Sequence, residues 1–203
     1  MNLKETYNII ANDWYGEVNK NHWWQQGVDK FISYLRKGDW VFDVGCGPGI
    51  TANTFIKNDV KVFGIDFSEK MIEIAQHQVP LGKFLVMDLA EVDKINNTFD
   101  AICMQNVLLH IPKKDVKKTL KSIVGKLKSK GYVYISVNEK KLHGPEEETK
   151  VDHDYGYRVE RFFCYFTAQE VKKYLTDLGF KIIFFTIVPA RNKRWIQVIG
   201  KKT

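Results

Sequence analysis

The residues from 43 to 49 combine an acidic side chain with a regular spacing of glycine. Asp43 ends a short apolar stretch, and Gly45, Gly47 and Gly49 follow it at alternate positions. Glycine lets a backbone turn sharply and approach a ligand with no Cβ in the way. Residues 50 to 57 have the pattern of a helix, whose first turn offers free N–H groups and a partial positive charge. This stretch predicts a loop that binds a ligand with an anionic end.

The spacing of these glycines excludes the dinucleotide fingerprint of nicotinamide and flavin enzymes. That fingerprint is G-x-G-x-x-G, whereas here the third glycine comes one residue early and Ile50 stands in the last position. The loop instead resembles the first motif of the class I S-adenosylmethionine-dependent methyltransferases. In that family the loop holds the amino-acid end of the cofactor. The resemblance therefore implies that S-adenosylmethionine binds here and that S-adenosylhomocysteine is the product.

Two more acidic residues end or follow predicted strands, at the sheet edge where ligands bind in open α/β folds. Asp66 ends the strand at 60–66, seventeen residues after Gly49, close to the spacing at which a carboxylate meets ribose hydroxyls. Asp88 follows the strand at 83–87, where the resembled family contacts the adenine amino group. A turn or helix cap is the alternative role for Asp88.

Further side chains are expected to complete the cofactor site. Phe67 is placed to stack on the adenine ring and Met71 to pack against it. Tyr7 and Trp14 lie in expected helices before the first strand and carry a polar group on an apolar body, with plain packing as the alternative. The predicted cofactor-binding residues are Asp43, Gly45, Cys46, Gly47, Gly49, Asp66, Phe67, Met71, Asp88, Leu89, Gln105, Tyr7 and Trp14.

His110 is the candidate general base. Methyl transfer from a sulfonium is an in-line displacement that depends on alignment, and an oxygen or nitrogen acceptor must also lose a proton. His110 follows the strand at 99–104 and titrates near neutrality; packing on the next helix is the alternative. No histidine pair has the short spacing of a metal motif, so no metal is expected. The predicted acceptor-binding residues are Asn106, His110, Tyr155, Arg158 and Phe163.

The stretch from 138 to 166 is the longest without a regular pattern. Long loops in compact domains are usually functional or disordered. This one follows the fifth predicted strand and leaves the sheet at the edge that carries the cofactor residues, so we expect a substrate lid. Its acidic run, Glu146, Glu147 and Glu148, favours a neutral or cationic acceptor.

Strands and helices alternate along most of the chain, which indicates a parallel sheet with right-handed crossovers. A closing hairpin is expected from strands at 180–188 and 194–200. The resemblance implies a Rossmann-like α/β fold with a seven-stranded, mostly parallel sheet in the order 3-2-1-4-5-7-6, an antiparallel last strand and helices on both faces. We expect a single methyltransferase domain over residues 1–203, with the helices of residues 1–37 over the cofactor cleft.

Composition limits the partners of the protein. The chain has 203 residues, a net charge of +7 and three cysteines, which we expect to be reduced thiols. Much of the positive excess lies between Lys113 and Lys130, where apolar residues at helical spacing leave the lysines on the other side. That pattern favours a solvated helix face over nucleic-acid binding. No apolar run reaches the roughly 20 residues of a membrane span and no signal region begins the chain, so we expect a cytoplasmic protein.

Three functions stay open. The best supported is a methyltransferase that acts on a small-molecule acceptor, as a monomer or homodimer. An RNA or tRNA methyltransferase that uses the lysine face is the second, and a catalytically silent cofactor-binding protein is the third. An amino-methylating DNA enzyme is disfavoured, because Gln105-Asn106-Val107-Leu108 stands where the Asn/Asp-Pro-Pro-Tyr/Phe motif would follow the fourth strand.

Overall fold

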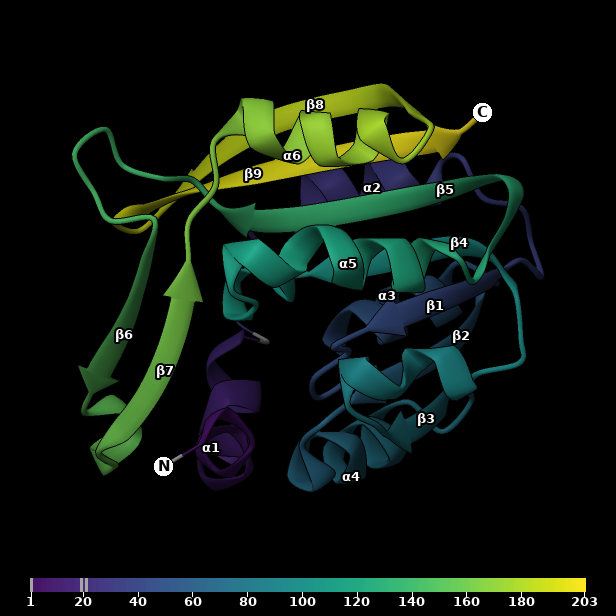
Figure 1. Ribbon diagram of the computed structural model, residues 1–203. Helices are drawn as coiled ribbons and strands as arrows, with labels where there is room; N and C mark the ends of the chain where they lie inside the picture. Colours follow the sequence, from purple (N-terminus) through teal and green to yellow (C-terminus); the bar gives the residue numbers. More distant parts are fainter. Residues whose placement is uncertain (1, 19, 21) are drawn as a thin grey trace.

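Seven strands form one twisted sheet, in a computed structural model that describes residues 2–18, 20 and 22–203 (Figure 1). The order across the sheet is β3-β2-β1-β4-β5-β9-β8, and β9 runs antiparallel to both of its neighbours. This confirms the predicted order and the antiparallel last strand. The strands predicted as the sixth and seventh are labelled β8 and β9, because two strands of a separate hairpin, β6 and β7, come before them in the chain. The strands are β1 (Trp40–Val44), β2 (Lys61–Asp66), β3 (Lys83–Val86), β4 (Phe99–Gln105), β5 (Leu127–Asn138), β8 (Phe180–Ala190) and β9 (Lys193–Lys202).

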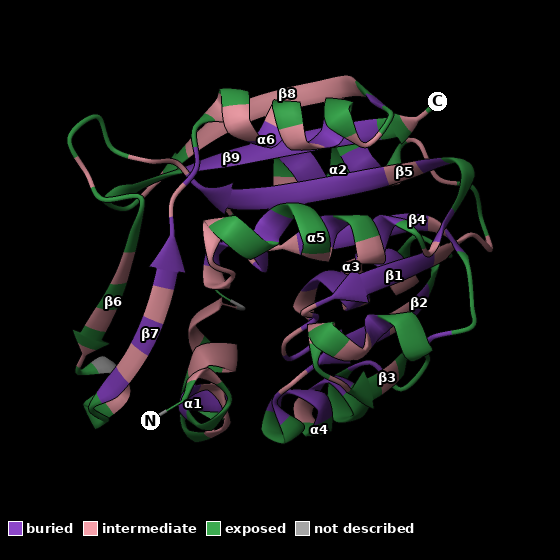
Figure 2. Ribbon diagram, in the orientation of Figure 1, coloured by how far each residue is buried: buried purple, intermediate pink, exposed green. Residues whose placement is uncertain are grey.

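Helices cover both faces of the sheet and leave its central strands buried (Figure 2). Apolar residues of α2 (Gln25–Ile32) and α3 (Ile50–Lys57) pack on one face, and those of α5 (Lys113–Val124) and α6 (Ala168–Asp177) pack on the other. In α5 the apolar residues at helical spacing are buried and most of the lysines face outward, as predicted. The helix ends at Val124, so the last residues of the predicted stretch, from 127 to 130, belong to β5. No helix of the described residues is long and apolar enough to cross a membrane.

Two polar caps fix where helices begin near the sheet edge. Ser68 accepts a hydrogen bond from the Met71 N–H at the start of α4 (Glu69–Gln78), and Thr167 forms a capping box with Glu170 at the start of α6. Pro112 is the residue immediately before the first turn of α5. Short 3₁₀ helices complete the connections: η1 (Leu89–Lys94), η2 (Leu108–His110) and η3 (Asp154–Gly156).

The first helix, α1 (Leu3–Val18), lies between α4 and strand β7 (Figure 1). On one side the Asn8 side-chain oxygen accepts from the Ser68 hydroxyl at 2.6 Å. On the other side the Thr6 hydroxyl donates to the Glu160 carbonyl at 3.1 Å. Residues 1–37, expected to form one or two helices, contain α1 and α2. Because α2 packs against the sheet, α1 is the helix that covers the carboxyl edge.

The expected irregular stretch at 138–166 contains a two-stranded antiparallel hairpin, which corrects the prediction. Its strands are β6 (Glu147–Asp152) and β7 (Val159–Cys164), which lie apart from the main sheet (Figure 1). Glu, Lys and Asp dominate β6 and are depleted in strands, and none of its residues is fully buried, so no apolar alternation marks it in the sequence. In β7 buried and half-buried side chains alternate from Val159 to Phe163, and Cys164 at the end of the strand is buried as well.

Candidate active site

A large cavity of about 1230 Å³ opens at the carboxyl ends of the parallel strands. Pockets for one drug-sized ligand are usually about 300–1,000 Å³, so this one has room for a cofactor together with an acceptor. Side chains from α1, the glycine loop, the ends of β2 and β4, the β6–β7 hairpin and the β8–β9 turn line it. Most of the predicted site residues line it together, whereas Gly49 and Arg158 do not.

The carboxylate of Asp66 fixes the shape of the glycine loop. One of its oxygens accepts from the Gly47 N–H at 3.0 Å, and the other accepts from the Ser68 N–H at 2.9 Å. Gly47 has φ +51, and a Cβ there would meet no atom within 4 Å, so the loop leaves open space above this residue. Gly49 has φ +81 but faces Ala75 of α4, so it shapes the start of α3 rather than the cavity wall.

Asp43 carries an unpaired oxygen into the same region. The residue is 2% exposed, and its Oδ2 atom has no hydrogen-bond partner among the described residues. Burial, and then the nearby charge of Asp66, raises the pKa of Asp43 to about 7. Burial also raises the pKa of Asp66 to about 6. A ligand that donates hydrogen bonds or brings positive charge would favour the ionised form of this pair.

The side chains that were predicted to surround the adenine lie together on the cavity wall. Phe67, Met71, Asp88 and Leu89 all line the cavity. Asp88 also caps η1, since its Oδ1 atom accepts from the Ala90 N–H at 2.8 Å. The two roles considered for Asp88, cap and cavity residue, are therefore compatible in position. Whether Asp88 contacts an adenine stays a prediction.

Tyr7 and His110 form a hydrogen-bonded pair at the cavity wall. The carbonyl oxygen of Phe162 lies 2.8 Å from Nδ1 of His110, and because a carbonyl can only accept, Nδ1 carries the proton. Nε2 is then the acceptor for the Tyr7 hydroxyl at 2.7 Å. Burial, followed by the charges of Arg161 and Lys193, lowers the pKa of His110 to about 4. His110 is thus neutral at pH 7, and its basic nitrogen faces Tyr7.

Aromatic side chains from distant segments build the other half of the cavity. Leu109, Phe163 and Trp195 form a buried cluster, and the Trp195 ring stacks on Trp23 with centroids 4.0 Å apart and an interplanar angle of 17°. Of the predicted acceptor residues, Asn106, His110, Tyr155 and Phe163 line the cavity. Neither tryptophan is among the predicted site residues, because Trp23 and Trp195 meet only in the folded chain.

Arg161 lines the cavity in place of the predicted Arg158. Alternate residues of β7 face the same side, so Arg161 and Phe163 point inward together, while Arg158 precedes the strand and is exposed. The Arg161 guanidinium pairs with Asp152 at 3.0 Å and lies 5.6 Å from the Phe163 ring centroid. Strand register, which the sequence did not reveal here, decides which arginine faces the site.

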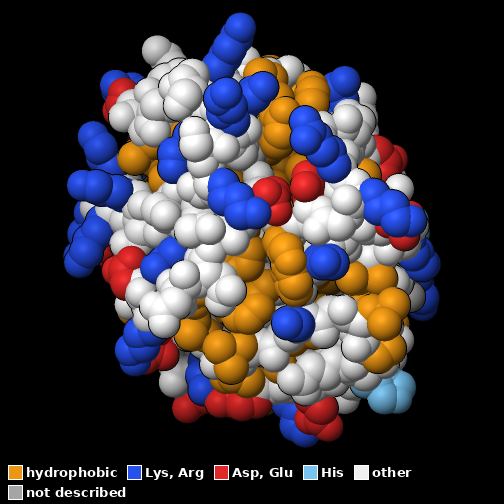
Figure 3. Space-filling view, turned by 90° about the vertical axis from the view of Figure 1, so that its right-hand side faces the viewer, with side chains coloured by type: hydrophobic (Ala, Val, Ile, Leu, Met, Phe, Trp, Pro, Cys, Tyr) orange, Lys and Arg blue, Asp and Glu red, His pale blue; other side chains and the backbone are white. Residues whose placement is uncertain are grey.

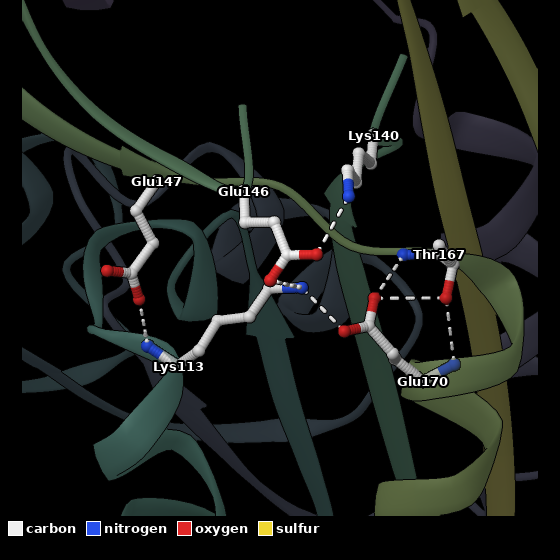
Figure 4. Close-up of polar contacts among 6 residues, drawn as sticks. All are labelled: Lys113, Lys140, Glu146, Glu147, Thr167 and Glu170. Atoms are coloured by element: carbon white, nitrogen blue, oxygen red, sulfur yellow. Dashed lines mark hydrogen bonds and ion pairs between the residues drawn. The ribbon is translucent and has the colours of Figure 1, made fainter. Parts of the chain in front are cut away.

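None of the three acidic residues of the expected run, Glu146, Glu147 and Glu148, lines the cavity, although Glu148 lies 3.2 Å from Lys150, which does. Glu147 accepts from the backbone N–H of Lys113 at 2.5 Å, and Glu146 pairs with Lys140 at 2.7 Å (Figure 4). The Lys113 ammonium also contacts Glu170 of the capping box at 2.5 Å. These contacts attach the hairpin to α5 and α6. Lys150, Arg161 and Lys193 are the hairpin and β9 cations that line the cavity instead.

Comparison with known proteins agrees with this arrangement of fold and site. Residues 18–183 match a family model described as a methyltransferase domain. A ubiquinone biosynthesis O-methyltransferase of Coxiella burnetii is 27% identical over 139 residues, which are 64% of this chain and 58% of that protein. The chain thus matches little more than half the length of this relative.

Solved structures show the same fold at low sequence identity. A magnesium protoporphyrin IX methyltransferase from Synechocystis with bound S-adenosylmethionine has a TM-score of 0.76 and 19% identity, covering 99% of this chain and 95% of that one. The 1,6-didemethyltoxoflavin-N1-methyltransferase of Burkholderia thailandensis, with bound S-adenosylhomocysteine, has a TM-score of 0.78 and 18% identity, covering 99% and 87%.

The chain belongs to the methyltransferase-domain family. The resemblance to class I S-adenosylmethionine-dependent methyltransferases, inferred from the glycine loop, is thereby confirmed. The predicted Rossmann-like sheet is confirmed as well. One of the two structural neighbours contains bound S-adenosylmethionine and the other contains S-adenosylhomocysteine.

Proposed function

We propose that the protein transfers the methyl group of S-adenosylmethionine to an oxygen or nitrogen atom of a small-molecule acceptor. The observation that carries this proposal is the continuity of one cavity. It joins the glycine loop and its two buried carboxylates to the Tyr7–His110 pair and the aromatic wall. A cofactor and an acceptor bound at the two ends would meet near His110, as an in-line displacement requires.

The residues at the loop end fit the cofactor. The open space at Gly47 lets a ligand lie directly against the loop backbone. The Oδ2 atom of Asp43, which has no partner among the described residues, can accept a hydrogen bond from an ammonium group. Asp66 holds the loop through the Gly47 N–H and lines the cavity, so it is placed for the ribose. When bound, S-adenosylmethionine supplies an electrophilic methyl group on a sulfonium.

The Tyr7–His110 pair is placed to take the acceptor's proton. Nε2 of His110 is unprotonated at neutral pH because the pKa of the imidazole is about 4. As the acceptor's oxygen or nitrogen bonds to carbon, its remaining proton becomes more acidic, so a weak base suffices. That proton passes to the Tyr7 oxygen while the Tyr7 proton passes to Nε2. His110 thus keeps the role proposed from the sequence, acting through Tyr7.

An RNA acceptor is supported less well than a small molecule. On the face seen in Figure 3, lysine and arginine side chains are spread among apolar and acidic ones and do not form one continuous basic stripe. On α5, Lys113 contacts Glu170 and Lys117 lies 3.9 Å from Asp177, so part of its positive charge is paired within the fold. The relatives compared above are named for small-molecule acceptors, one as an O-methyltransferase and one as an N-methyltransferase.

The direct test is a transfer assay with isotope-labelled S-adenosylmethionine and a panel of phenols, heteroaromatic N–H compounds and carboxylates, followed by mass spectrometry. A methylated product that is lost in Tyr7→Phe supports the proposal. Product with bulk tRNA, together with binding that weakens steeply as salt rises, would favour the RNA methyltransferase. Tight S-adenosylhomocysteine binding with no product from either panel would favour a catalytically silent cofactor-binding protein.

A further inference from the structure

Asn138 carries a buried side-chain amide. It ends β5, is 2% exposed and lines the cavity, yet neither its oxygen nor its nitrogen has a hydrogen-bond partner among the described residues. Leaving a buried polar group unpaired costs folding stability. A nearby buried amide shows the usual arrangement. Gln197 of β9 accepts from the Tyr134 hydroxyl at 3.2 Å and donates to the Trp23 carbonyl at 3.4 Å.

The surroundings of Asn138 are flat and aromatic. Trp195 is its direct partner in the antiparallel β5–β9 ladder, so the two side chains project from the same face of the sheet. Trp195 stacks on Trp23 and packs with Phe163 and Leu109, and these side chains line the cavity as well. A ligand beside Asn138 would therefore meet aromatic faces with its rings and an amide with its edge.

This amide lies in the acceptor half of the cavity. The Phe163 ring centroid is 5.2 Å from that of His110, whose Nε2 atom bonds to Tyr7. A planar molecule held by Phe163 and Trp195 is thus next to the groups proposed to take its proton. The glycine loop and Asp43 belong to the opposite end of the cavity, at the ends of β1 and β2.

We propose that Asn138 determines acceptor specificity by binding a planar, ring-containing acceptor whose edge carries a hydrogen-bond donor beside an acceptor, as in a cyclic amide (lactam). A primary amide presents an oxygen acceptor next to N–H donors, so it makes two parallel hydrogen bonds to such an edge. Rotation of the amide by 180° exchanges its donor and acceptor, so either order on the ligand edge can be matched. The proposal rests on the methyltransferase function, because it assigns the acceptor of that reaction.

The test compares two matched probes, quinolin-2(1H)-one and its N-methyl derivative, which lacks the N–H donor. Their affinities are measured by titration with and without saturating S-adenosylhomocysteine. Wild-type protein is expected to bind the N–H compound at least about tenfold more tightly, in line with the loss of a buried hydrogen bond. In Asn138→Leu and Asn138→Ala this preference disappears.

Gln197→Leu is the matched control, since Gln197 is a buried amide of the neighbouring strand that does not line the cavity. The Gln197→Leu variant should keep the tenfold preference for the N–H compound. Its melting temperature should be lower than that of the wild type, because the substitution removes the hydrogen bonds that the Gln197 side chain makes. Asn138→Leu should leave the melting temperature of the ligand-free protein unchanged or raise it by a few degrees. A wild-type protein that does not distinguish the two probes, or variants at Asn138 that still distinguish them, would overturn the proposal. Absence of S-adenosylhomocysteine binding would instead overturn the methyltransferase function.

Discussion

The hydroxyl of Tyr7 lies 2.7 Å from Nε2 of His110, a contact between residues 103 positions apart in the chain. It exists because α1 is clamped between α4 and β7, which brings Tyr7 over the end of β4. The opposite ring nitrogen is fixed by the Phe162 carbonyl, so the tautomer of His110 is set by the fold. Helix, hairpin and sheet thus each contribute to the proposed proton-transfer pair.

Removing the Tyr7 hydroxyl should slow transfer without weakening cofactor binding. We expect Tyr7→Phe to lower kcat by about 100-fold, the lower end of the range for general acid–base catalysis. Tyr15→Phe on the same helix is the control, because Tyr15 does not line the cavity. Steady-state kinetics and S-adenosylhomocysteine titration check both variants. Equal kcat for Tyr7→Phe and wild type would remove the pair from the mechanism.

Adding one methyl group to the glycine loop should block the cofactor. Gly47 and Gly38 both have positive φ, at +51 and +87, and in both cases an added Cβ would meet nothing within 4 Å. Gly47→Ala and Gly38→Ala should therefore lose similar stability, about 1 kcal/mol each from the left-handed backbone. Only Gly47→Ala should also lose affinity for S-adenosylmethionine, since Gly38 is remote from the cavity. Similar affinity losses in both variants would indicate a general folding defect.

Asp66→Ala should weaken S-adenosylmethionine binding by about tenfold or more. Hydrogen bonds to a charged group contribute roughly 1.5–3 kcal/mol each, and the carboxylate also holds the Gly47 N–H. Isothermal titration of the variant measures the change, with circular dichroism to show that it is folded. Unchanged affinity in a folded Asp66→Ala protein would refute the ribose role assigned to this residue.

The buried Asp43 should make the ligand-free protein less stable as pH rises. Its pKa is about 7 when folded and near 4 when unfolded, so between these values the folded state binds more protons. Stability from this group is complete below pH 4 and is lost as pH rises through 7. Asp43→Asn has no such charge, so its stability relative to wild type should improve by roughly 2 kcal/mol between pH 5 and pH 8.

Urea unfolding at the two pH values measures that difference. His110 changes stability in the opposite direction, which is lost as pH falls from 6.5 through 4, but it is present in both proteins and cancels. The same variant should bind S-adenosylmethionine more weakly, because it cannot offer a negative charge to an ammonium. A wild-type protein and Asp43→Asn that respond equally to pH would show that Asp43 is not buried as an ionisable group.

Local patterns were sufficient to predict which residues gather at one end of the cavity, and their contact with a cofactor stays a prediction. Asp43 is the next-to-last residue of β1, Asp66 ends β2 and Asp88 follows β3. Parallel strands bring these carboxyl ends to one edge of the sheet. The acceptor half depends on contacts between remote segments, so the sequence did not reveal it. Trp195 reaches Trp23 across 172 residues, and neither is marked by a motif.

The hairpin shows a second limit of local patterns. The first strand of the hairpin, β6, is so polar that its sequence has no recognisable strand pattern. Which arginine of the hairpin faces the cavity, Arg161 or Arg158, depends on the register of β7. Asn138 was not singled out either, because an asparagine at the end of a strand is unremarkable until its partners, or their absence, are known.

The measurement that tests the central claim most directly is isothermal titration of the purified protein with S-adenosylmethionine and S-adenosylhomocysteine, with NADH as the control ligand. A cavity built as described should bind the first two with micromolar affinity and show no binding of NADH. A folded protein that binds neither S-adenosylmethionine nor S-adenosylhomocysteine would contradict the assignment of the glycine loop, Asp43 and Asp66 to a methyl-donor site.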